Sequence, residues 1–82
     1  MEKIKGEFWR IEENKLRLQI KTKVEQSEVQ RILPEWKCIS YGFVPKTMED
    51  IYVFERKFDK ENDLTNFVNS DIVTKRLEMR EV

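Results

Sequence analysis

The sequence predicts a small α+β domain in which one antiparallel sheet carries two helices on one face. Three observations favour this class. Two runs rich in aromatic and β-branched residues flank the turn-forming segment 45–50, and the region 36–58 holds six of the nine aromatic residues. Two other segments, 24–33 and 60–69, place apolar residues at helical spacing. Finally, the two halves of the chain repeat their apolar positions at a nearly constant offset.

The first predicted strands form a hairpin. Residues 6–12 and 15–23 read as strands joined at Glu13-Asn14, since Asn tolerates the positive φ of a two-residue turn. The second strand alternates cleanly between apolar and polar residues, as a half-buried strand does. Its expected inward residues are Leu16, Leu18 and Ile20, with Trp9 and Ile11 of the first strand on the same face.

A second hairpin is predicted from residues 36–44 and 50–58. In the first of these strands, Ile39, Tyr41 and Phe43 are expected on one face, and Cys38, Ser40 and Gly42 on the other. In the second strand, Ile51 and Val53 are expected to face the helices, which places Tyr52, Phe54, Arg56 and Phe58 on the opposite face.

The two helices have recognisable ends. The helix at 24–33 offers a capping box from Ser27 and Gln30 and stops before Pro34. Asp59 is a candidate cap for the helix at 60–69. The tail, residues 72–82, could form a last strand with Leu77 and Met79 inward or another helix, and the internal repeat favours the strand.

The internal repeat selects the topology. A shift of 35 residues moves the apolar positions of segments 15–23 and 24–33 onto those of 50–58 and 60–69. A shift of 36 residues moves Tyr41 onto Leu77 in the same way. Two β-α-β units in tandem give this pattern. We therefore predict a ferredoxin-like β-α-β-β-α-β sheet with both helices on one face and an extra N-terminal strand.

The extra strand competes with that order. In a ferredoxin-like sheet the strand at 15–23 is central, so the segments 6–12 and 72–82 would claim the same side of it. The alternative is β-β-α-β-β-α, with the tail outside the sheet. Either way, residues 1–82 are predicted to form one small domain.

Composition argues against several functions. Sixteen basic residues balance sixteen acidic ones, and zero net charge argues against a general polyanion binder. The chain contains no histidine, so it has no imidazole base and no usual zinc ligand set. The two isolated glycines form no phosphate-binding loop. We expect no cofactor, no metal and no catalysis.

The cellular setting follows from the same counts. Cys38 is the only cysteine, which favours a reducing compartment. No segment is apolar and long enough to span a bilayer, so we expect a cytoplasmic protein without membrane contact. Alanine, whose codons are GC-rich, is absent. This bias indicates an AT-rich genome, such as that of a low-GC bacterium, its phage or a mobile element.

The predicted uncovered face of the sheet is the candidate binding site. It combines two aromatic rings with basic side chains: Tyr52, Phe54, Arg56, Arg17, Lys21 and Arg76. Two aromatic residues two apart on a central strand resemble the stacking residues of RNA-recognition-motif sheets. That resemblance implies binding of single-stranded RNA or DNA. The strand D-I-Y-V-F-E-R-K-F lacks the glycine-rich motif of that family.

Aromatic and arginine side chains are also enriched at protein interfaces. We therefore expect a non-enzymatic interaction protein. It would bind a protein partner, or a second copy as a homodimer, through the sheet face or an exposed edge strand. The single-stranded nucleic-acid module is the alternative.

Overall fold

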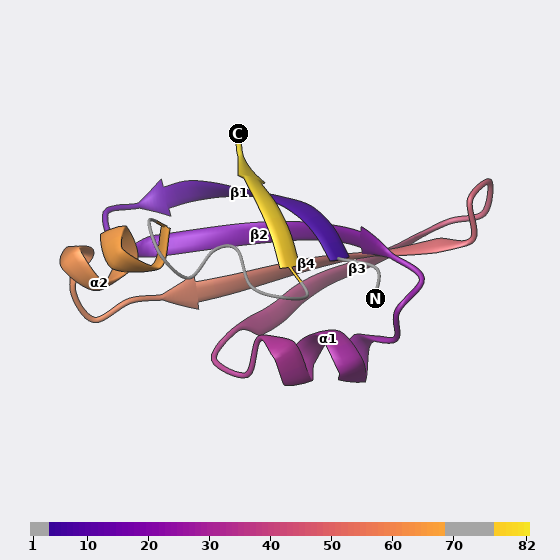
Figure 1. Cartoon of the computed structure of the whole chain (residues 1–82), viewed down its shortest axis with the longest axis horizontal. Helices are drawn as coiled ribbons and strands as arrows, with labels where there is room; N and C mark the ends of the chain where they lie inside the picture. Colours follow the sequence, from indigo (N-terminus) through magenta and orange to yellow (C-terminus); the bar gives the residue numbers. More distant parts are fainter. Residues whose placement is uncertain (1–3, 69–76) are drawn as a thin grey trace.

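The chain folds into a five-stranded mixed sheet with two short helices. The computed structural model describes residues 4–68 and 77–82. Within them, the elements are β1 (Ile4–Glu12), β2 (Lys15–Thr22), α1 (Gln26–Ile32), β3 (Lys37–Val44), β4 (Glu49–Lys57), α2 (Glu61–Asn66) and β5 (Leu77–Glu81). The strand order is β3-β4-β2-β1-β5, and every neighbouring pair is antiparallel except β1 with β5 (Figure 1). The predicted α+β class is confirmed.

The strand order is not the ferredoxin-like one. β1 occupies the place beside β2 that this topology assigns to the final strand, and β5 pairs in parallel with the far side of β1. The turn at 13–14 explains the outcome, because a short hairpin closes with little loss of chain entropy. The alternative order β-β-α-β-β-α describes the first six elements. Its tail, however, joins the sheet at 77–81, and residues 72–76 of the predicted last strand lie outside the described residues.

Both helices are shorter than predicted and begin without a side-chain cap. α1 starts after Glu25, so Ser27 lies inside the helix and the predicted capping box does not form. α2 starts after Lys60 and not after Asp59. Helices of this length are unstable alone in water. They are therefore held by packing, through the fully buried Val29 and Leu64.

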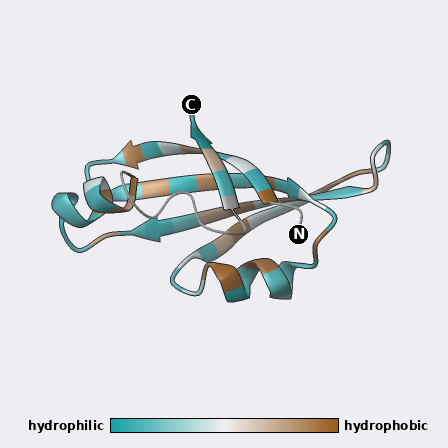
Figure 2. Ribbon diagram, in the orientation of Figure 1, coloured by the Kyte–Doolittle hydropathy of each residue, from teal (hydrophilic) through white to brown (hydrophobic). Residues whose placement is uncertain are grey.

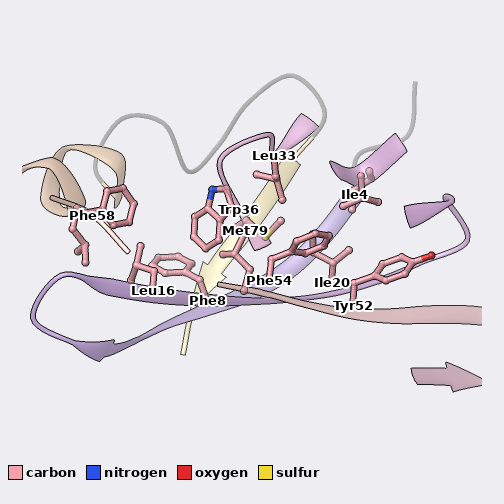
Figure 3. Packing of buried hydrophobic residues seen from close by; sticks show 13 residues of the cluster. Ile4, Phe8, Leu16, Ile20, Leu33, Trp36, Tyr52, Phe54, Phe58 and Met79 are labelled. Carbon is pink, nitrogen blue, oxygen red and sulfur yellow. The ribbon is translucent and has the colours of Figure 1, made fainter. Parts of the chain in front are cut away.

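One apolar cluster lies between the sheet and both helices. Figure 3 shows side chains of β1, β2 and β4 rising from one side of the sheet toward Leu33 and Trp36. The ring of Trp36 packs edge-on against that of Phe58, with 6.4 Å between centroids. Along the strands, hydrophobic and hydrophilic residues alternate (Figure 2). The buried members are Ile4, Phe8, Leu16, Leu18, Ile20, Val29, Leu33, Trp36, Tyr52, Phe54, Phe58, Leu64 and Met79.

The side chains of β4 face the opposite way from the prediction. Tyr52 and Phe54 lie under the helices, with 2% and 0% of their surface exposed, whereas Ile51 and Val53 lie half-buried on the other face. Pairing with β2 sets this orientation, because Phe54 lies opposite the inward Leu18. β4 is apolar on both faces, so alternation alone does not decide between them. Burying the larger rings removes more apolar area from water.

β1 shows the same reversal. Phe8 lies opposite Leu18 and is buried, while Trp9 lies opposite Arg17 on the face away from the helices. We call this side the uncovered face; it carries Trp9, Arg17, Lys21, Ile51, Val53 and Glu55. The prediction that Trp9 points inward is therefore wrong. Phe8 takes its place in the core.

β3 forms one edge of the sheet and contains a bulge. Its pairing with β4 shifts between Cys38 and Ser40. The shift brings Cys38 to the helix side together with Tyr41 and Phe43, although alternation alone predicts Cys38 on the other face. Toward its tip, the β3–β4 hairpin projects beyond the helices at the right of Figure 1.

Candidate functional site

The six predicted binding residues do not form one surface. Tyr52 and Phe54 are core residues, so the predicted pair of exposed rings does not exist. Arg56 also lies on the helix side, with its guanidinium carbon 4.2 Å from the ring centroid of Phe58. It is paired there with Glu35 at 2.5 Å. Arg17 and Lys21 lie on the uncovered face, as predicted, and Arg76 lies outside the described residues.

Arg17 is neutralised by a carboxylate on the neighbouring strand. Its guanidinium donates two hydrogen bonds to Glu55 Oε2, at 2.8 and 3.3 Å, and the ammonium of Lys15 lies 3.1 Å from Glu55 Oε1. The hydrogen bond from Arg17, followed by that from Lys15, lowers the pKa of Glu55. The centre of the uncovered face is therefore an ion-pair network. It is not a row of free cations.

Lys21 belongs to a different environment, at the end of β2. Together with Lys5 of β1 and Lys23, it lines a hollow of about 520 Å³. Glu49 is the one acidic residue that lines it among the described residues. None of the three lysines forms an ion pair with another described residue. This basic hollow is the part of the predicted site in which the cations are not paired with carboxylates of the described residues.

The largest exposed apolar side chains gather elsewhere, on β3 and its hairpin turn. Ile39, Tyr41, Phe43 and Met48 are exposed by 42%, 61%, 47% and 66%. We call these four residues, together with the backbone of β3, the β3 edge. Within β3 the one charged residue is Lys37, at its start. In the described sheet, β3 pairs with β4 alone, so its other side presents free backbone groups.

Tyr41 and Phe43 are exposed because the helices do not reach them. The seven residues of α1 span about 10 Å at the usual rise of a helix. The eight residues of β3 span about 26 Å. Both rings point to the helix side, as alternation predicts, but they lie past the end of the helical layer. The sequence signal for the exposure of these two rings is the difference in length between the short helix and the longer strand.

Asp50 holds the tyrosine ring of the β3 edge in place. The Tyr41 hydroxyl donates to Asp50 Oδ1 at 2.7 Å, and the Tyr52 hydroxyl lies 3.2 Å from Oδ2. The Tyr52 hydroxyl is also 3.3 Å from the carbonyl oxygen of Val24. The two rings are 5.6 Å apart between centroids. The exposed Tyr41 is thus anchored to a buried ring and to a carboxylate, which limits its rotamer freedom.

This cluster predicts an alkaline limit to stability. Burial and the hydrogen bond with Asp50 raise the pKa of Tyr52 to about 12, and the hydrogen bond with Asp50 raises the pKa of Tyr41. The protonated form of Tyr52 therefore stabilises the fold fully below pH 10, its unfolded value, and this contribution is lost as the pH rises toward about 12. We expect tyrosinate absorbance of the native protein to appear only above pH 10, whereas both tyrosines should titrate near 10 in urea.

The Tyr52→Phe variant is the matched control for this titration. It should lose the absorbance step near pH 12 and keep the step of Tyr41. A native protein in which both tyrosines titrate at pH 10 would contradict the arrangement around Asp50.

Two other features are absent from the described part of the chain. Residues 4–68 and 77–82 contain no group of three or more histidine, cysteine, aspartate or glutamate residues arranged to hold a metal ion. No helix within these residues is long and apolar enough to cross a membrane. Comparisons with protein-family models, with curated proteins and with solved structures find no match to this chain. A functional proposal therefore depends on the geometry of its own residues.

Proposed function

We propose that this protein is a small binding module that contacts another protein chain through the β3 edge and acts by binding alone, without catalysis. The observation that carries the proposal is the exposure of Tyr41 and Phe43 beside the free backbone of an edge strand. Edge strands are usually blunted by charges, prolines or short length, because they pair readily with other chains. β3 has a bulge near its start and is followed by Pro45, but the stretch Ser40–Val44 between them is regular and uncharged.

The turn of the hairpin adds a second argument. Met48 has φ of 59°, in the left-handed region, and is the one non-glycine residue with positive φ in the described chain. A side chain there costs about 1–2 kcal/mol that glycine would avoid. Met48 is also the most exposed large apolar residue of the hairpin. Flexible methionine side chains are common at binding surfaces, so a binding role accounts for a methionine at this strained position.

The burial of Tyr52 and Phe54 weighs against the nucleic-acid alternative. A single-strand binder needs exposed rings on which bases stack, and these two rings are inside the core. Pairing with Glu55 also places a carboxylate in competition with phosphate for Arg17. The alternative rests on one observation, the basic hollow at Lys5, Lys21 and Lys23.

Two charge-changing variants separate these functions. Phe43→Glu alters the β3 edge, and Lys21→Glu alters the basic hollow; both side chains are exposed, so we expect unchanged circular dichroism for each. Chemical cross-linking in cells, followed by affinity capture, is expected to recover protein partners or dimers with the wild type and with Lys21→Glu. Phe43→Glu should lose them.

Fluorescence titration with a mixed single-stranded oligonucleotide supplies the opposing result. Salt-sensitive binding that survives Phe43→Glu and disappears in Lys21→Glu would reject protein contact at the β3 edge in favour of nucleic acid. A partner whose capture is unaffected by Phe43→Glu would also reject the proposed surface.

A further inference from the structure

We infer that the occupant of the β3 edge is an extended segment of a different protein. It pairs with Ser40–Val44 as a sixth strand and carries apolar side chains at alternate positions, with acidic residues outside them. This inference rests on the proposed function and specifies its partner. Four features of the edge define the segment: its usable length, the rings on one face, a notch on the other, and the charges at the two ends.

The usable length is set by two interruptions. At the N-terminal end, the bulge between Cys38 and Ser40 breaks the regular ladder. At the C-terminal end, Pro45 has no amide hydrogen to donate and follows the last residue of β3. A regular added strand therefore fits residues 40–44. Five residues suit a short peptide segment better than a full edge-to-edge joining of two sheets.

The two faces of this stretch offer different contacts. On the helix side, Tyr41 and Phe43 are two residues apart, and their exposed rings can pack against two alternate apolar side chains of an added strand. On the uncovered face, Gly42 leaves a notch between Ser40 and Val44. A Cβ at Gly42 would meet one neighbour, Cβ of Ile51 at 3.9 Å. A large side chain from the added strand fits over this glycine, as aromatic residues do beside edge glycines.

Charge selects a foreign segment over a second copy. Lys37 and Lys46 bracket the stretch, and neither forms an ion pair with another described residue. In an antiparallel pair of Ser40–Val44 stretches centred on Gly42, Lys46 of one copy would lie opposite Cys38 of the other, next to Lys37. Like charges placed across strands are destabilising. Acidic residues at both ends of a partner segment would instead complement the two lysines.

A display library of random decapeptides, selected on the full chain, tests the inference. Enriched peptides are expected to share alternating apolar residues bounded by Asp or Glu. The bound peptide should shift and protect the amides of Ser40–Val44 in nuclear magnetic resonance spectra. Two versions of a peptide, each methylated at every second backbone amide but offset by one residue, should differ. One should lose binding and the other should keep it, because an added strand forms its backbone hydrogen bonds to the neighbouring strand through alternate residues. This last measurement leaves the protein itself unchanged.

The Gly42→Ile variant fills the notch at a position where a Cβ makes one ordinary contact, with Ile51 at 3.9 Å, so the fold should persist. Its Kd for the selected peptides is expected to rise about tenfold or more. Gln19→Ile, which adds the same side chain to the exposed surface of β2, is the control and should bind like the wild type.

The outcomes separate the inference from the proposed function. Peptides that bind Ser40–Val44 without acidic residues, or that bind Gly42→Ile equally well, overturn the inference and leave the β3 edge as the binding surface. A dimer in sedimentation velocity whose amide protection covers Ser40–Val44 also overturns it, since the occupant is then a second copy. Selected peptides that shift only amides outside the β3 edge overturn both.

Discussion

Replacement of Phe54 by alanine is expected to lower the free energy of unfolding by about 3–5 kcal/mol, the usual cost of removing a buried phenylalanine. Phe54 is fully buried on the inner strand β4, between Leu18 of β2 and Cys38 of β3. Domains of this size are stabilised by only about 5–15 kcal/mol in total. The variant should therefore unfold at a much lower urea concentration than the wild type. Circular dichroism and tryptophan fluorescence measure this unfolding.

Phe43→Ala is the matched control for this experiment. It removes the same side chain from the neighbouring strand, at a position that is half exposed at the β3 edge. The loss of stability should be about 1 kcal/mol or less. The prediction from alternation alone places Phe43 inward and Phe54 on the surface. It would therefore expect the larger loss of stability in Phe43→Ala. Equal losses in the two variants would contradict the position of Phe54 under the helices.

The element boundaries were predictable because they depend on local chemistry. The turn at Glu13-Asn14, the proline after α1 and the aromatic strand runs each mark an element within a few residues of its observed bounds. β2 was also predictable in its orientation, since its apolar residues occupy one face only. Local periodicity determines side-chain direction wherever a single face is apolar.

The orientation of β4 could not be read in this way. Every residue from Ile51 to Phe54 is apolar. Either set of alternate residues could therefore face the core without breaking the apolar pattern. Its register comes from pairing with β2, which is separated from it in sequence by α1 and β3. The 35-residue repeat misleads at this point, because it aligns inward residues of β2 with outward residues of β4. A shift of 36 residues aligns Leu16 and Leu18 with Tyr52 and Phe54 instead.

The candidate site was missed for a related reason. Alternation gives the side of the sheet on which Tyr41 and Phe43 lie, but it does not say how far the covering layer extends. Their exposure follows from the short α1 and from the projecting hairpin. The expectation of an exposed edge strand was independent of these rings and named no particular strand. β3 is one of the two edges of the described sheet.

Gly6→Ala is expected to destabilise the fold by about 1–3 kcal/mol, as overpacking a tight site does. The reason is space and not backbone conformation, since no described glycine has positive φ. A Cβ at Gly6 would lie 2.6 Å from the carbonyl oxygen of Gln19 on β2 and 2.8 Å from Sδ of Met79 on β5. The methionine side chain can move, but the backbone oxygen belongs to the β1–β2 ladder.

Gly42→Ala provides the comparison, because the added Cβ there makes one ordinary contact with Ile51 at 3.9 Å. Urea unfolding should place Gly42→Ala within about 0.5 kcal/mol of the wild type. In Gly6→Ala, hydrogen exchange should rise first at the amides of β5, because β5 is held to the sheet by β1 alone among the described strands. Equal stability of the two glycine variants would contradict the close packing of β1 between β2 and β5. Loss of β5 alone, with the core amides still protected, would show that this strand is an addition to a sheet that is already stable.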